Sequence, residues 1–211
     1  SKNLEPIRAN YLQLLAEVNK KDVDFDSLAQ IISMDLSLTY NLLKLVNSSA
    51  FGFRYKIQSV KHGVVALGYR QIKKWAYLVF LNTVGSKETK ELTKISMIRG
   101  RFLEILALKS RYRRNSQELF LMGLLSLLDA ILKRPLDEIL DELKVIDKVR
   151  EGLLKGRGEF GDLFKMILSY EDGQWDDFIE KAQDLRMNLE EVSESYMEAI
   201  IWYNKLQTER E

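Results

Sequence analysis

Few side chains in this sequence could catalyse a reaction or hold a metal. The chain has one histidine and no cysteine, so disulfides, thiolate zinc sites and thiol nucleophiles are excluded. The histidine, His62, is followed by Gly63 near the expected start of a short helix, and we interpret it as a packing or hydrogen-bonding residue. No glycine-rich phosphate loop or dinucleotide-binding motif is present. The sequence therefore predicts no catalytic residue, no metal ligand and no cofactor.

Two polar residues interrupt the most apolar segment of the chain, residues 119–132. In one continuous helix, Ser126 and Asp129 lie one turn apart on the same face. They could line a site for a ligand or a partner. The interpretation that we prefer is structural: Ser126 bonds the carbonyl four residues earlier, and Asp129 reaches the surface or a neighbouring base.

A polar turn follows the third expected helix. Asn47 and Ser48, together with Ser49, could form a recognition turn. Asn and Ser beyond a helix also commonly satisfy its last carbonyl groups and start the next turn. We favour this structural role and keep Asn47 and Ser48 as candidate interaction residues.

Basic residues gather in the first half of the chain, among them Arg70, Lys73 and Lys74. They share a segment with Trp75 and Tyr77, and basic-plus-aromatic surfaces can bind nucleotides or single strands. We place both aromatic side chains in the core instead. Lys and Arg number 32 against 31 Asp and Glu, which gives no net field toward nucleic acid. Nucleic-acid binding is therefore not expected.

The segments that carry these candidates follow helical spacing almost throughout. Apolar residues recur at i, i+3, i+4 and i+7, and this order holds even in residues 72–80, whose composition alone would suit a strand. The sequence therefore predicts an all-α fold without a sheet. Methionines 34, 97, 122 and 166 are expected to fill the core. Helices are expected within residues 7–18, 28–32, 35–46, 59–67, 72–80, 95–106, 119–132, 135–143, 160–170, 175–185 and 189–206.

Several residues mark where these helices begin and end. Asp35 is a suitable N-cap, and Gly68 can end a helix by adopting a left-handed conformation. Pro135 suits the first turn of a helix, and Asn188 with Glu191 forms a capping-box pattern. These signals fix the order of the helices along the chain.

The chain is expected to form two packed helical lobes, residues 1–84 and 85–211. The polar segment 84–89 contains Gly85 and Ser86 and is the best candidate for a hinge between them. With 211 residues, of which 46% are apolar, the chain is long enough to bury a continuous core. No apolar run approaches the roughly 20 residues that span a bilayer, and no signal peptide is evident, so we expect a cytoplasmic protein without membrane association.

Three blocks of the sequence resemble the HDOD domain. Residues 35–52 read DLSLTYNLLKLVNSSAFG, with the acidic start, leucine-rich helix and Asn-Ser turn of that family; residues 57–75 read IQSVKHGVVALGYRQIKKW. Residues 120–140, FLMGLLSLLDAILKRPLDEIL, with YEDGQWDDF at 170–178, are similar to the HDOD half of bacterial proteins that carry an EAL domain in front. The resemblance implies an HD-domain-like helical bundle, and one HDOD domain from a longer EAL-HDOD chain.

The resemblance also implies a relation to the HD-GYP phosphodiesterases, which cleave cyclic di-GMP with metals bound by histidines and aspartates. An adjacent His-Asp pair would follow Gly123, Leu124 and Leu125. This chain has Ser126 and Leu127 there, and neither side chain can replace an imidazole or a carboxylate at a metal. The sequence is therefore similar to a modified HD-GYP domain in which Ser126 and Asp129 mark a vestigial pocket.

These features favour a noncatalytic signal-transduction domain that binds a protein partner or its own N-terminal EAL domain. The alternative is a nucleotide sensor, in which the degenerate pocket binds cyclic di-GMP or a related phosphate ligand without hydrolysis. An arginine-lined concavity near Ser126 would favour the sensor. A phosphohydrolase that uses carboxylates alone is the least favoured hypothesis, and tightly bound metal would be needed to support it.

Overall fold

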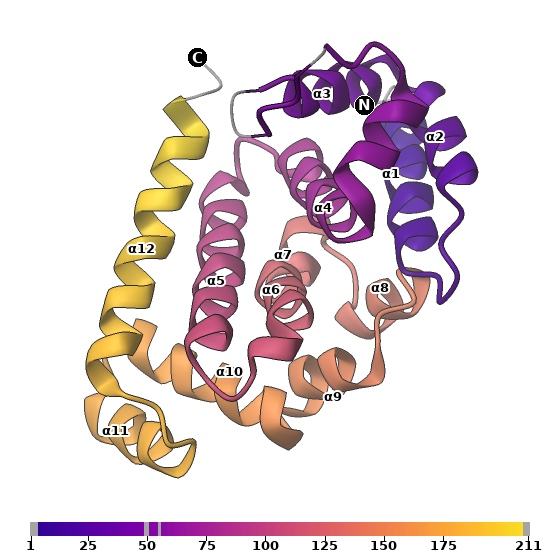
Figure 1. Ribbon diagram of the computed structural model, residues 1–211. Helices are drawn as coiled ribbons and strands as arrows, with labels where there is room; N and C mark the ends of the chain where they lie inside the picture. Colours follow the sequence, from indigo (N-terminus) through magenta and orange to yellow (C-terminus); the bar gives the residue numbers. More distant parts are fainter. Residues whose placement is uncertain (1–3, 49–50, 55, 209–211) are drawn as a thin grey trace. The chain divides into compact units, whose positions relative to one another are not determined.

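The computed structural model of the chain is built from helices and the segments that join them (Figure 1). It describes residues 4–48, 51–54 and 56–208, and within these ranges no strand occurs, so the predicted all-α fold is confirmed. The helices are divided between two compact units. Unit 1 comprises Ser1–Val84 and Glu142–Lys144, and unit 2 comprises Gly85–Asp141 and Val145–Glu211. The elements are α1 (Leu4–Val18), α2 (Phe25–Ser33), α3 (Leu36–Val46), α4 (Val60–Val84), α5 (Lys90–Lys109), η1 (Arg113–Asn115), α6 (Ser116–Leu125), α7 (Leu128–Leu132), α8 (Leu136–Glu142), α9 (Asp147–Lys155), α10 (Gly158–Glu171), α11 (Trp175–Asp184) and α12 (Leu189–Thr208).

Unit 1 is organised around α4, which contacts α1, α2 and α3. Gly68 interrupts this long helix with φ 69° and ψ 168°, so the expected break at this glycine is confirmed. The inward faces of the four helices contribute the core, and Tyr77 is fully buried there, with its hydroxyl 2.5 Å from the Asn19 amide nitrogen. Burial raises the pKa of Tyr77 far above its usual range.

Two of the predicted helix caps form. The Asp35 carboxylate accepts hydrogen bonds from the backbone N–H groups of Ser37 (2.8 Å) and Leu38 (3.0 Å). The Asn188 side chain accepts from the N–H groups of Glu190 (2.9 Å) and Glu191 (3.3 Å) at the start of α12. Each cap satisfies donors that have no partner within the helix.

Unit 2 is organised around the crossing of α5 and α6, and α12 packs along α5 (Figure 1). Gly100 of α5 and Gly123 of α6 meet at the crossing. A Cβ atom on Gly123 would overlap the backbone of Arg99 and Gly100. The missing side chains therefore allow the two backbones to approach closely, and this approach brings Arg99 toward the end of α6.

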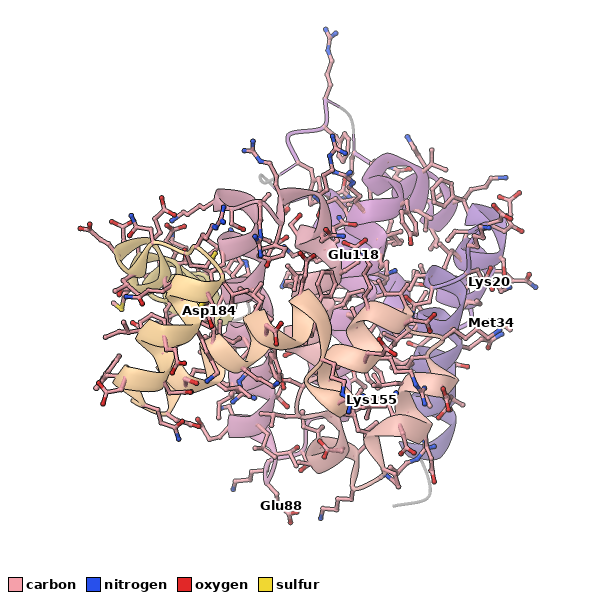
Figure 2. The ribbon with its side chains drawn as sticks, turned by 90° about the horizontal axis from the view of Figure 1, so that it is seen from below. Lys20, Met34, Glu88, Glu118, Lys155 and Asp184 are labelled. Carbon is pink, nitrogen blue, oxygen red and sulfur yellow. The ribbon has the colours of Figure 1, made fainter. Side chains whose placement is uncertain are left out.

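Two expectations about the apolar segments were wrong. Residues 119–132 do not form one helix: α6 ends at Leu125, and α7 begins at Leu128. The predicted core position of Met34 is also wrong, because this side chain is 66% exposed and lies at the periphery in Figure 2. Met34 is the C-cap of α2, so helical periodicity no longer determines which way it faces. The other three methionines named above are buried.

Candidate functional site

Ser126 is the C-cap of α6 and is half-buried. Its hydroxyl donates a hydrogen bond to the carbonyl of Gly123 at 2.8 Å, three residues earlier and not four as the sequence suggested. The Arg99 Nη1 group in turn donates to the Ser126 hydroxyl at 3.3 Å. The serine thus serves both as a helix end-group and as an acceptor for a neighbouring cation.

Arg99 also forms an ion pair with Glu171, the last residue of α10. The distance from Arg99 Nε to Glu171 Oε2 is 2.7 Å, and the two side chains are only 13% and 11% exposed. Burial raises the pKa of the Glu171 carboxyl, while the charge and hydrogen bond of Arg99 act in the opposite direction. Arg99, Ser126 and Glu171 therefore form a connected polar cluster, which we call the Arg99 cluster.

Aromatic side chains pack next to this cluster. The ring of Tyr170, the residue before Glu171, lies 5.4 Å from that of Tyr196 and 6.0 Å from that of Phe102. Burial, followed by the negative charge of Glu171, raises the pKa of the Tyr196 hydroxyl. The ion pair itself is little exposed, and low local polarity strengthens the interaction between its charges.

The structure separates Asp129 from Ser126. The break at residues 126–127 places Asp129 in the first turn of α7, where it is exposed. The two residues therefore do not share a face of one helix. Sequence reasoning missed Arg99, which bonds Ser126, and Glu171, which pairs with Arg99. The position of Glu171 within the YEDGQWDDF block was the available signal for one of them.

The Asn47 side chain joins the end of α3 to the loop before α4. Its amide nitrogen donates to the carbonyl groups of Leu43 and Ile57, both at 2.8 Å, and its oxygen accepts from the N–H of Ile57 at 2.8 Å. The Ser48 hydroxyl donates to the carbonyl of Leu45 at 2.7 Å. Both side chains satisfy backbone groups, as the preferred structural interpretation requires. Ser49 lies outside the described residues.

We expect Asn47→Ala to lower the free energy of unfolding by about 1–2 kcal/mol, because three hydrogen bonds are lost at an exposed position. Urea denaturation followed by circular dichroism measures this loss. Asn41→Ala, in the same helix, is the control and should change stability by less than roughly 0.5 kcal/mol. Equal losses in the two variants would contradict the bridging role of Asn47.

The basic residues of α4 are not accompanied by exposed aromatic side chains at positions 75 and 77. Trp75 and Tyr77 are 6% and 0% exposed, so their predicted place in the core is confirmed. Arg70 is exposed, whereas Lys73 and Lys74 are half-buried. The Lys73 ammonium lies 3.3 Å from the Tyr69 hydroxyl and 5.6 Å from the centre of its ring. This arrangement offers neither Trp75 nor Tyr77 for stacking on a base.

A cleft in unit 2 shares no lining residue with the Arg99 cluster. It has a volume of about 520 Å³ and includes Asp184, labelled in Figure 2. Asp177, in its wall, bonds Lys181 and Ser169, and these hydrogen bonds lower the pKa of the Asp177 carboxyl. Among the described residues, no group of three or more His, Asp or Glu side chains is placed to hold a metal ion. The cleft is lined by Arg111, Glu159, Asp162, Lys165, Asp177, Glu180, Lys181, Asp184 and Leu185.

Fold and site together define an all-helical domain whose central polar cluster is an ion pair bonded to a serine. The family model described as "HDOD domain" matches residues 4–140, which is more than half of the chain. The chain therefore belongs to the HDOD family. In the part of the chain that the structure describes, no helix is both long and apolar enough to cross a membrane.

Two curated relatives match nearly the whole chain. The "Uncharacterized protein YuxH" of Bacillus subtilis (strain 168) is 33% identical over 93% of this chain and 48% of its own length. The "Cyclic di-GMP phosphodiesterase CdgJ" of Vibrio cholerae serotype O1 is 27% identical over 90% of this chain and 44% of its own length. The chain thus spans about half the length of these relatives. A solved structure, the MmoQ response regulator from Methylococcus capsulatus strain Bath, is similar with a TM-score of 0.43 and 16% identity, covering 89% of this chain and 95% of the other.

Proposed function

We propose that this chain is a noncatalytic HDOD regulatory domain that binds a protein partner in bacterial cyclic di-GMP signalling. The observation that carries the proposal is the hydrogen bond that Arg99 donates to Ser126. Arg99 is at the same time held in a largely buried ion pair with Glu171. Ser126 stands at the first position of the His-Asp pair that the HD-GYP resemblance implies. A guanidinium group remains charged at physiological pH, so its position beside Ser126 disfavours a divalent cation there.

The comparisons support the signalling context of this proposal. CdgJ is named a cyclic di-GMP phosphodiesterase, and both curated relatives contain about as much chain again outside the matched region. A noncatalytic domain can act by binding a second domain of the same polypeptide. The EAL domain that the sequence resemblance implies is one such partner. Cyclic di-GMP signalling takes place in the cytoplasm, and we propose that location for this domain.

The proposal is tested by incubating the purified chain with cyclic di-GMP and either Mg²⁺ or Mn²⁺. Full-length CdgJ serves as the comparison enzyme. We expect intact nucleotide in every reaction with this chain, measured by chromatography of the nucleotide pool. Hydrolysis that persists after repeated purification, and that follows the protein across column fractions, would overturn the noncatalytic assignment.

Calorimetric titration with cyclic di-GMP separates the protein-binding function from the nucleotide-sensor alternative. We expect no saturable heat with or without Mg²⁺, because the Arg99 guanidinium that a phosphate would need is already paired with Glu171. Saturable binding without hydrolysis would favour the sensor. In that case Arg99→Met should abolish binding, and Arg70→Met, which removes an exposed arginine of unit 1, should leave it unchanged.

A further inference from the structure

Unit 1 includes a short segment from the second half of the sequence. Unit 2 begins at Gly85, is interrupted at Glu142–Lys144 and resumes at Val145. The interruption begins at the last residue of α8 and belongs to unit 1. The chain therefore leaves unit 2 for three residues and returns to it at once. We call residues 142–144 the strap.

Leu143 anchors the strap in unit 1. Its side chain is 0% exposed, whereas the side chains of Glu142 and Lys144 on either side of it are exposed. The carbonyl of Leu143 accepts a hydrogen bond from the amide nitrogen of Asn19, the residue after α1, at 2.7 Å. The same nitrogen donates to the hydroxyl of the buried Tyr77. Leu143 is thus held both by burial of its side chain and by a hydrogen bond to its backbone.

The residues on both sides of the strap are held in unit 2. Asp141, immediately before it, forms an ion pair with Arg150 of α9 through both carboxylate oxygens. At the other end, Lys144 adopts a left-handed conformation with φ 51°. The N–H of Val145 then bonds the carbonyl of Leu140 at 3.2 Å, which closes a turn at the end of α8. This turn returns the chain to unit 2 directly after the strap.

We propose that the strap is a latch that restrains movement of unit 1 relative to unit 2 about the segment 84–89. Asp141 is held in unit 2 and Leu143 in unit 1, and two residues span at most about 7 Å. While both residues are held, this short link limits how far the units can move apart at the strap. Release of Leu143 removes the restraint without unfolding a helix of either unit. The latch follows from the path of the chain and does not depend on the proposed function.

Distances between two spin labels, one in each unit, test the latch in the complete chain. The sequence has no cysteine, so Leu36→Cys in unit 1 and Glu194→Cys in unit 2 introduce labels at two exposed positions. Double electron–electron resonance should give a narrow distance distribution with the strap intact. Leu143→Ala truncates the buried anchor, so it should raise the released population about a hundredfold and broaden the distribution. Leu28→Ala, which truncates a fully buried leucine of α2, is the matched control and should leave the distribution narrow.

Cleavage by trypsin after Lys144 measures release of the strap itself, because the protease requires a locally opened chain. Asn19→Ala removes the hydrogen bond to Leu143 and should accelerate this cleavage about fivefold, as measured by mass spectrometry of the fragments. Tyr77→Phe removes the other acceptor of the same amide group and should leave the rate unchanged. Because these two variants keep Leu143, the comparison does not require Leu143→Ala to fold. The proposal is overturned by a distance distribution that Leu143→Ala leaves unchanged, by equal broadening with Leu28→Ala, or by equal cleavage of Asn19→Ala and Tyr77→Phe.

Discussion

Replacing Gly123 with alanine is expected to lower the free energy of unfolding by about 2–3 kcal/mol. The new methyl group would overlap the backbone of Arg99 and Gly100, which cannot move away as a flexible side chain can. Helices α5 and α6 must separate to accommodate it, and the packing of both helices is disturbed. This loss exceeds the gain of about 1 kcal/mol that alanine brings to a helix relative to glycine.

Gly63→Ala provides the control for this prediction. Gly63 is also buried within a helix, but the nearest atom to an added Cβ is a Leu42 methyl carbon at 3.4 Å, an ordinary contact. We expect this variant to be neutral or more stable by up to about 1 kcal/mol. Urea denaturation of both variants measures the difference. If Gly123→Ala proves as stable as Gly63→Ala, the α5–α6 crossing is looser than described.

Local signals in the sequence were sufficient to predict the helices and several of their ends. Asp35 and Asn188 cap helices through hydrogen bonds that span two or three residues, so the residue type and its position carry the information. The break at Gly68 is similar, because glycine adopts a positive φ without steric cost. The burial of Trp75 followed from helical periodicity in the same way.

The central polar cluster could not be predicted in this way, because its members come from distant parts of the chain. Arg99 and Glu171 are 72 residues apart, and their pairing depends on how α5 and α10 are placed in unit 2. The helix break after Leu125 could not be predicted either. Leucines continue through the break, so the spacing of apolar residues gives no sign of a turn there. Ser126 was recognised as unusual in sequence, and its hydroxyl does bond a carbonyl of its own helix, but its second partner, Arg99, was missed.

Ser126 lies beside a fixed cation, Arg99, and this position supports the proposed absence of catalysis. In a metal-dependent phosphodiesterase, ligands at such a position must concentrate negative charge or neutral lone pairs around a cation. Here the serine hydroxyl accepts a hydrogen bond from a guanidinium, and the nearby carboxylate neutralises that guanidinium. The polar groups of the cluster satisfy one another, which is consistent with the proposed noncatalytic role.

Removing the cation from this cluster should be strongly destabilising at neutral pH. We expect Arg99→Met to lower the free energy of unfolding by about 3 kcal/mol, because the Glu171 carboxylate would be left buried without its counter-charge. Combining Arg99→Met with Glu171→Leu removes both charges and should recover most of the loss. Urea denaturation of wild type, both single variants and the double variant gives the coupling energy between the two residues.

The stability difference between Arg99→Met and wild type should depend on pH, in a direction that the pKa of Glu171 determines. Burial already raises the pKa of Glu171 above its unfolded value, and Arg99 is the group that opposes this rise, so its removal raises the pKa further. A carboxyl with a raised pKa favours the folded state below its unfolded pKa, and this contribution is lost as pH rises through the folded pKa. The stability gap between Arg99→Met and wild type should therefore be small at acidic pH and widen above the usual glutamate range. A gap that is constant with pH would show that lost packing by the Arg99 side chain, and not the isolated Glu171 charge, causes the destabilisation.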